Sequence, residues 1–167
     1  HATVDLCTIM FEDSAHVQKQ ETESENRRRA RMGQDPREPL YTEEDAKETM
    51  QYLQGVAYDE TIGITDAVEV VYRDAGHILG SSICEVFVTE NGKKTKIVFS
   101  GDIGQWDVPI VRNPSLIADA DYLLIESTYG DRLHEGGKDR DAALLERVIE
   151  AYKKGGRLMI PAFSVER

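Results

Sequence analysis

Two stretches, Asp74-Ala-Gly-His77-Ile-Leu-Gly-Ser-Ser82 and Phe99-Ser-Gly-Asp102-Ile-Gly104, decide the fold of this chain of 167 residues. Each places one side chain that can bind a metal, His77 or Asp102, among small residues at the end of an apolar run. A third stretch of the same kind is Glu126-Ser-Thr-Tyr-Gly-Asp131. Hydrolytic metal centres carry their ligands on loops that a rigid sheet holds in place. The order and spacing of the three stretches therefore predict such a centre.

The residues between the first two stretches predict a β-hairpin. Ser82 to Thr89 is apolar and β-branched, Asn91-Gly92 is a strong turn signal, and Lys96 to Phe99 returns. His77 precedes the first strand of this hairpin and Asp102 follows the second. Because antiparallel pairing brings these two ends to the same edge of the sheet, we expect the two side chains to meet there.

The rest of the chain alternates between helix and strand patterns. A further strand leads into the His77 loop, and the helix that ends at Lys153-Lys154-Gly155-Gly156 has the clearest apolar stripe. We expect helices at 2–31, 42–53 and 139–154, a strand at 68–72, and buried strands at 122–125 and 158–160. A hairpin followed by strand, helix and strand predicts an α/β fold with a mixed sheet.

Composition and charge limit the functional classes. Hydrophobic residues make up 40% of the chain and charged residues 31%, and no apolar run reaches the length of a membrane span. Cys7 and Cys84 fit reduced thiols better than a disulfide framework, so we expect a cytoplasmic protein with no membrane contact. The net charge of −11 argues against a surface that binds nucleic acid by charge alone.

One basic run, Arg27-Arg28-Arg29-Ala-Arg31, interrupts the acidic composition. Phosphate contact is one interpretation of this run. Glu21, Glu23 and Glu25 largely balance its charge, so a solvated helix face is the favoured interpretation. Trp106, after the Asp102 stretch, has two interpretations as well: stacking on a base, or the commoner role of lining its loop.

The motifs as a set resemble the metallo-β-lactamase fold, and specifically its β-CASP branch of RNA-processing nucleases. Gly76-His77-Ile-Leu-Gly80-Ser81, Ser100-Gly101-Asp102 and Glu126-Ser-Thr-Tyr-Gly130 are similar to three motifs of that branch. Asp13-Ser-Ala-His16 resembles a stretch upstream of the His77 motif in bacterial members. Ile160 to Arg167 resembles the strand at which the inserted β-CASP lobe begins.

The resemblance implies a di-zinc hydrolase that cleaves RNA phosphodiester bonds. It assigns His77 as a ligand of one zinc ion and Asp102 as the carboxylate that bridges both ions and takes part in catalysis. Glu126 is implied as a residue that positions the site. RNA is the implied partner, a homo-oligomer is a possible state, and the basic contacts to RNA are expected mostly from the inserted lobe.

One departure from the family pattern concerns the His-x-His-x-Asp-His signature, which is absent from these residues. We therefore interpret 1–160 as the second part of the N-terminal lobe of an αββα sandwich, and 161–167 as the start of the inserted lobe. Such a fragment is expected to be inactive alone, because it carries only two of the expected ligands.

Each candidate residue also has a purely structural interpretation. His77 is then a loop histidine bonded to backbone, Asp102 a turn residue between glycines, and Glu126 a member of a buried ion pair. His134 is expected in a surface loop. Asp13 is a weak candidate for supporting the site, and His16 is expected to pack beside Val17 on its helix.

Two other functions remain open on the sequence. A non-catalytic scaffold of the same family would bind RNA or protein partners with a decayed site. A metallo-β-lactamase-fold hydrolase of small esters or thioesters is the other, although the stretch from Glu126 and the ending at Pro161 weigh against it.

Overall fold

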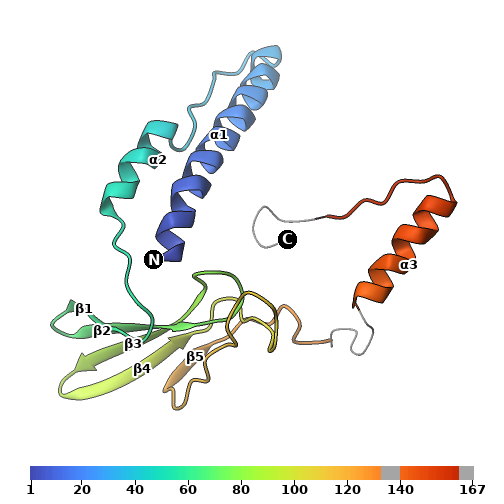
Figure 1. The fold of residues 1–167 in the computed structure, drawn as a ribbon. Helices are drawn as coiled ribbons and strands as arrows, with labels where there is room; N and C mark the ends of the chain where they lie inside the picture. Colours follow the sequence, from blue (N-terminus) through green and yellow to red (C-terminus); the bar gives the residue numbers. More distant parts are fainter. Residues whose placement is uncertain (133–139, 162–167) are drawn as a thin grey trace. The chain divides into compact units, whose positions relative to one another are not determined.

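The computed structural model describes residues 1–132 and 140–161, which fall into two compact units, 1–124 and 125–167. The helices and strands are shown in Figure 1. They are α1 (Ala2–Arg31), α2 (Glu43–Thr49), the short 3₁₀ helix η1 (Met50–Tyr52), β1 (Thr61–Thr65), β2 (Val68–Asp74), β3 (Ser82–Glu90), β4 (Lys93–Phe99), β5 (Tyr122–Leu124) and α3 (Arg140–Lys153). The predicted class, α/β with a mixed sheet and helices, is confirmed.

The first unit contains one five-stranded sheet in the order β1-β2-β3-β4-β5. Strands β1 to β4 form an antiparallel meander, and β5 joins β4 in parallel. The predicted hairpin of β3 and β4 is confirmed: Cys84 pairs with Phe99, and Asn91 and Gly92 form the turn with positive φ angles. Strand β1 was not among the expected strands, because it is short, exposed and interrupted by Gly63.

The hydrophobic core of the sheet is small and lies beside the site loops. Ala75, Ile83 and Val98 form one buried cluster, and Ile117 from the long loop between β4 and β5 packs against it. Because Ala75 directly follows β2, the core fixes the position at which the His77 loop leaves the sheet.

A buried carboxylate links three strands of this sheet. Glu85 on β3 is 3% exposed, and it accepts hydrogen bonds from Arg73 Nε on β2 (2.6 Å) and Lys96 Nζ on β4 (2.5 Å). Burial alone raises the pKa of Glu85, but the two cationic donors outweigh it and hold the pKa below its ordinary value. The pair of cations therefore makes burial of a charged group tolerable.

Helices α1 and α2 pack against each other as a hairpin. Ala15 and Ala46 are the residues buried between them, and the Ser14 and Tyr41 hydroxyls lie 2.6 Å apart. The predicted N-cap of α2 is confirmed, since Thr42 and Asp45 form a reciprocal capping box. Among the described residues no helix combines the length and hydrophobicity that crossing a membrane requires.

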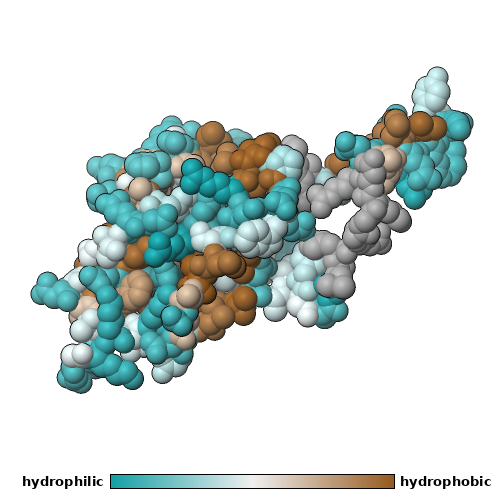
Figure 2. Space-filling view, turned by 60° about the horizontal axis from the view of Figure 1, so that its bottom comes forward, coloured by the Kyte–Doolittle hydropathy of each residue, from teal (hydrophilic) through white to brown (hydrophobic). Residues whose placement is uncertain are grey.

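The second unit consists mainly of α3, which ends as predicted. Gly155 has a φ of +60°, and the Gly156 N–H donates to the Ala151 carbonyl at 2.9 Å, which is a Schellman-type end. The apolar stripe of α3 is exposed, and Figure 2 shows apolar side chains on the surface of this helix. The stripe consists of Leu144, Leu145, Val148, Ile149 and Tyr152.

Two predictions about buried strands are wrong. Leu158–Ile160 has no regular secondary structure and is exposed, because no neighbouring strand of its unit pairs with it. Tyr122–Leu124 does form a strand, but its side chains are more than half exposed at the edge of the sheet. A short apolar run shows that a segment can be buried as a strand. Whether the segment is buried depends on another element that packs against it.

Candidate metal centre

The loop that carries His77 is held by hydrogen bonds to its own backbone. Asp74 Oδ1 accepts from the Gly76 N–H at 2.9 Å, and Ser81 Oγ accepts from the N–H groups of His77 and Ile78 at 3.1 and 3.2 Å. Ala75 closes the loop by donating its N–H to the Ser81 carbonyl at 3.2 Å. These bonds fix the backbone of His77 and do not involve its imidazole.

The loop that carries Asp102 lies directly against the His77 loop. The Gly104 N–H donates to the Ala75 carbonyl at 2.9 Å. A Cβ atom at Gly104 would overlap the carbonyl group of Gly76 and come within 2.7 Å of the His77 nitrogen. Glycine is therefore required at this position, because only a residue without a side chain allows the two backbones to touch.

A third segment, residues 112–115, also packs against the His77 loop. Gly76 has a φ of +62°, and a Cβ atom there would lie 2.5 Å from the Arg112 carbonyl and 2.7 Å from the Pro114 nitrogen. The Ser115 N–H donates to the Asp74 carbonyl at 2.8 Å. Residues 112–115 therefore pack against the start of the His77 loop.

This packing brings the two predicted side chains together. His77 Nε2 lies 3.9 Å from Asp102 Oδ2, and their side chains are 45% and 72% exposed. The expectation that the hairpin delivers both to one edge is confirmed, while their roles as metal ligands stay predictions. Among residues 1–132 and 140–161, no group of three or more His, Cys, Asp and Glu side chains is arranged to hold a metal ion.

The remaining candidate, Glu126, is partly buried and follows β5 by two residues. It belongs to the second unit, which starts at Ile125. Its predicted positioning role stays a prediction. His134 lies outside the residues that the structure describes.

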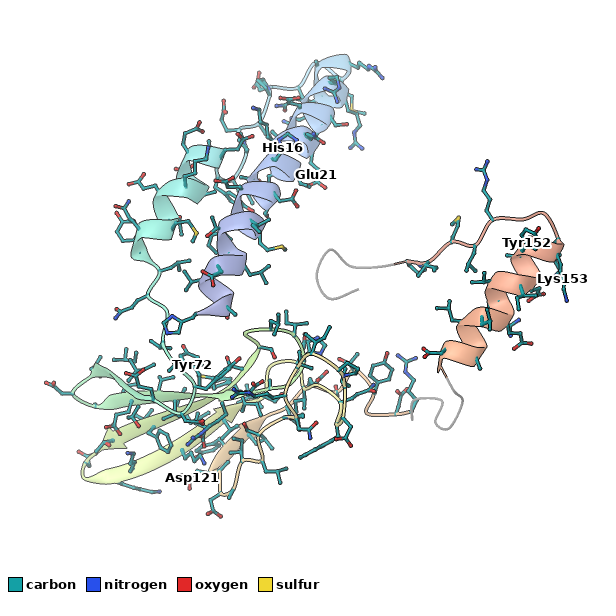
Figure 3. All side chains as sticks on the ribbon, viewed as in Figure 1. His16, Glu21, Tyr72, Asp121, Tyr152 and Lys153 are labelled. Carbon is teal, nitrogen blue, oxygen red and sulfur yellow. The ribbon has the colours of Figure 1, made fainter. Side chains whose placement is uncertain are left out.

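The other polar candidates lie on the surface of the first unit. His16 points outward from α1, with Nδ1 3.4 Å from Glu43 Oε1 and Nε2 2.8 Å from Gln20 Nε2 (Figure 3). The expected packing beside Val17 is not found, because both side chains are exposed. Asp13 is also exposed, and Trp106 is 56% exposed in the loop after Asp102.

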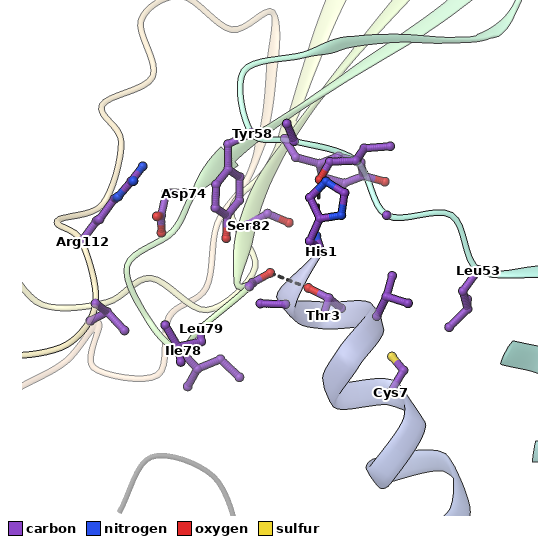
Figure 4. A pocket seen from close by; sticks show the side chains of 18 of the residues that line it. His1, Thr3, Cys7, Leu53, Tyr58, Asp74, Ile78, Leu79, Ser82 and Arg112 are labelled. Atoms are coloured by element: carbon purple, nitrogen blue, oxygen red, sulfur yellow. Dashed lines mark hydrogen bonds between the residues drawn. The ribbon is translucent and has the colours of Figure 1, made fainter.

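A cavity of about 670 Å³ lies behind the His77 loop, between the start of α1 and the segment before β1 (Figure 4). Tyr58 donates its hydroxyl to the Ser81 carbonyl at 2.7 Å, and Thr3 Oγ1 donates to the Gly80 carbonyl at 2.9 Å. Burial and the nearby charge of Asp74 raise the pKa of Tyr58. The lining includes Ile78 and Gly80 of the loop but neither His77 nor Asp102, so the cavity is distinct from the candidate metal centre.

Three residues that hold the site in shape, Ser81, Gly104 and Tyr58, were not predicted to do so. Ser81 and Gly104 stand inside the quoted motifs, so their presence was visible but their contacts were not. An Asp two residues before a glycine, as in Asp74-Ala-Gly76, is a turn signal that predicts the observed bond. The bond from Tyr58 spans 23 residues and has no local signal.

No family model matches this chain. Ribonuclease TTHA0252 from Thermus thermophilus is 35% identical over 166 residues, which are 99% of this chain and 33% of that protein. RNase aCSPSF2 from Saccharolobus solfataricus is 34% identical over 74% of this chain and 24% of its own length. An RNase J-like protein from Methanocaldococcus jannaschii is 29% identical over all of this chain and 35% of its own length.

This chain is a homologue of the β-CASP ribonucleases. The resemblance inferred from the motifs of His77, Asp102 and Glu126 is thereby confirmed. The homology covers nearly the whole chain, whereas the chain spans about a third of the length of the Thermus ribonuclease. None of the three β-CASP relatives has a name that refers to hydrolysis of small esters or thioesters.

Proposed function

We propose that this chain is part of a zinc-dependent ribonuclease, a hydrolase that cleaves phosphodiester bonds in RNA. The observation that carries the proposal is the approach of His77 Nε2 to Asp102 Oδ2 at 3.9 Å, on two loops that touch only because Gly104 has no side chain. The homology of this chain to proteins named as ribonucleases supports RNA as the substrate.

His77 and Asp102 have the chemistry that a zinc site needs. Neutral imidazole is a suitable ligand for zinc, and a carboxylate has two oxygens, so Asp102 can offer one to each of two ions. Both side chains are open to solvent, which leaves room for further ligands. Two residues are fewer than the three or four that zinc requires, so the proposal includes ligands from outside this pair.

Zinc, when bound, supplies Lewis acidity that makes a water molecule more acidic and stabilises charge on a phosphate. This chain's own contribution is to hold the ligands. Ser81 Oγ holds the His77 backbone in place by accepting two N–H hydrogen bonds. The contact of Gly104 with Gly76 holds the Asp102 loop close to His77. Glu126 is proposed to position groups near the site from the end of β5.

Two coarser features accompany the proposal. Cys7 and Cys84 are both free thiols, which supports a reducing, cytoplasmic location. RNA is the proposed partner in binding as well as in cleavage, and the net charge of −11 means that phosphate contacts must come from restricted surfaces.

The test is Asp102→Asn in the natural protein that carries these residues, with cleavage of a labelled RNA and zinc content measured together. The matched control is Asp119→Asn, an exposed loop aspartate with a positive φ, at which Asn is well tolerated. We expect Asp102→Asn to lower the cleavage rate by at least about 100-fold. Even mutation of a residue that only hydrogen-bonds to a metal ligand typically lowers metal affinity or activity about 10- to 100-fold.

The zinc measurement separates the functional classes. Zinc content that falls in Asp102→Asn and in His77→Ala, but not in Asp119→Asn, supports the proposed ligands. RNA binding without zinc and without cleavage would instead indicate the scaffold function. Unchanged cleavage in Asp102→Asn would refute the assignment of this residue.

A further inference from the structure

The last turns of α1 carry a cluster of arginines that the candidate metal centre does not use. Arg27, Arg28 and Arg31 fall on one face of the helix around Ser24, because residues three and four apart are neighbours on a helix. Together with Glu21 and Glu25 they line a shallow surface groove.

The neighbouring acidic residues do not neutralise this cluster by contact. Glu25 Oε1 lies 3.5 Å from Arg37, so this carboxylate already has a partner. Arg29 donates its Nε to the Asp35 carbonyl at 2.6 Å and thereby holds the loop after α1. Within the described part of the chain, no carboxylate lies within ion-pair distance of Arg27, Arg28 or Arg31. All three arginine side chains are exposed to solvent.

The cations of the sheet behave differently. Arg73 and Lys96 are bound to Glu85, and Lys94 Nζ lies 2.6 Å from Glu69 Oε2. These three cations of the sheet are therefore paired with carboxylates of the same sheet. In the groove on α1, the three guanidinium groups of Arg27, Arg28 and Arg31 outnumber the carboxylates of Glu21 and Glu25, so this surface is locally positive although the net charge of the chain is −11.

We propose that Arg27, Arg28 and Arg31 form a surface that binds the phosphate backbone of RNA. The proposal rests on the proposed function, since it names where this chain contacts its substrate. Guanidinium groups bind phosphate oxygens with paired hydrogen bonds, and release of counterions adds to the affinity. Contacts of this kind hold RNA without selecting its sequence.

The surface is separate from the candidate metal centre. α1 begins at the His77 loop, where Thr3 bonds to the Gly80 carbonyl. From Thr3 to Arg27 an α-helix rises by about 36 Å at 1.5 Å per residue. Substitutions at the arginines are therefore expected to leave the zinc content of the protein unchanged.

The test is the triple variant Arg27→Gln, Arg28→Gln, Arg31→Gln, because Gln keeps the helix propensity of Arg while removing its charge. A fluorescein-labelled single-stranded RNA of 30 nucleotides is titrated, and fluorescence anisotropy is measured from 50 to 200 mM KCl. The control variant removes three other exposed charges that have no described ion pair, by Lys47→Gln, Lys93→Gln and Lys153→Gln. Circular dichroism confirms that both variants keep their helices.

Loss of three phosphate contacts has a defined signature. The slope of log K against log salt is expected to fall by about 2, which corresponds to a roughly 100-fold weaker affinity at 100 mM salt. The slope of the control variant is expected to differ from that of the wild type by no more than the change for about one phosphate contact. Equal slopes in both variants, or an unchanged slope in the arginine variant, overturn the proposed surface and leave the ribonuclease proposal standing. No RNA binding by the wild type at 50 mM salt would overturn both.

Discussion

Glu85 in the sheet and Glu150 on α3 have the same partners in kind but not the same surroundings. Glu85 is buried between Arg73 and Lys96, whereas Glu150 binds Arg147 (2.9 Å) and Lys154 (2.7 Å) along an exposed helix face. Hydrogen bonds from Lys154 and Arg147 lower the pKa of Glu150, and for Glu85 the cationic donors must first overcome burial. Ion pairs of the same kind are therefore expected to contribute differently to the stability of the two units.

Apolar side chains show the same contrast. Ile83 and Val98 are 4% and 2% exposed in the first unit, while Leu145 on α3 is 59% exposed. The strand pattern and the helix pattern are equally clear in the sequence. Among the described residues, the buried apolar cluster lies in the first unit, so we expect packing to contribute more to the stability of this unit than to that of α3.

The largest expected effect comes from Gly104→Ala. The new Cβ atom would overlap the Gly76 carbonyl, so the Asp102 loop must leave the His77 loop, and we expect a loss of about 3 kcal/mol or more. Gly156→Ala in the second unit is the matched control, because its Cβ atom would lie 3.7 Å from the nearest atom. Urea unfolding of both variants measures the difference, and equal midpoints would contradict the close contact of the loops.

Ile83→Ala is expected to cost about 3 kcal/mol, because it leaves a cavity next to Ala75 and Val98. Leu145→Ala removes a similar side chain from an exposed face of α3 and is expected to change the unfolding free energy by less than about 0.5 kcal/mol. A large cost for Leu145→Ala would show that the stripe of α3 is covered in solution, which would sharpen the contrast between the units.

Glu85→Gln is expected to cost about 2 kcal/mol at pH 7, because Arg73 and Lys96 lose a charged acceptor. The pKa of Glu85 is below its ordinary value, so its stabilisation is complete above about pH 4.5 and is lost as pH falls through the folded-state pKa. The advantage of the wild type over the variant should therefore shrink in acid.

The control for this pH experiment is Glu150→Gln, whose carboxylate is paired but exposed. Its midpoint of urea unfolding is expected to match that of the wild type at pH 7, since screening by water weakens such pairs. If both variants lost equal stability, burial would not be the cause of the difference.

Ser81→Ala is the smallest expected effect, at about 1 kcal/mol, because one hydroxyl acceptor is removed. The informative measurement is amide hydrogen exchange at His77 and Ile78, which should become faster. Ser127→Ala, at an exposed position of the second unit, should leave both rates unchanged. Unaltered exchange in Ser81→Ala would mean that the hydroxyl does not hold the His77 loop.

Much of the candidate site could be predicted from the sequence, because its cause is local. A hairpin with Asn91-Gly92 at its turn brings its two ends together whatever surrounds it, and so His77 and Asp102 meet. The strand predicted at 158–160 is not formed, since a strand needs a neighbouring strand to pair with and no local pattern tells whether one is present.

Local patterns in the sequence were enough to predict the α/β class, most helix ends, the hairpin and the pair His77 and Asp102, since periodicity, caps and turn residues act over a few positions. Three features depend on the tertiary structure: Gly104 touches Gly76, Glu85 is buried between two cations, and Arg37 binds Glu25 while Arg27, Arg28 and Arg31 have no ion-pair partner among residues 1–132 and 140–161. These outcomes depend on atoms that are distant in the chain or on competition among several partners. Burial and pairing are properties of the whole fold, and short-range patterns do not contain them.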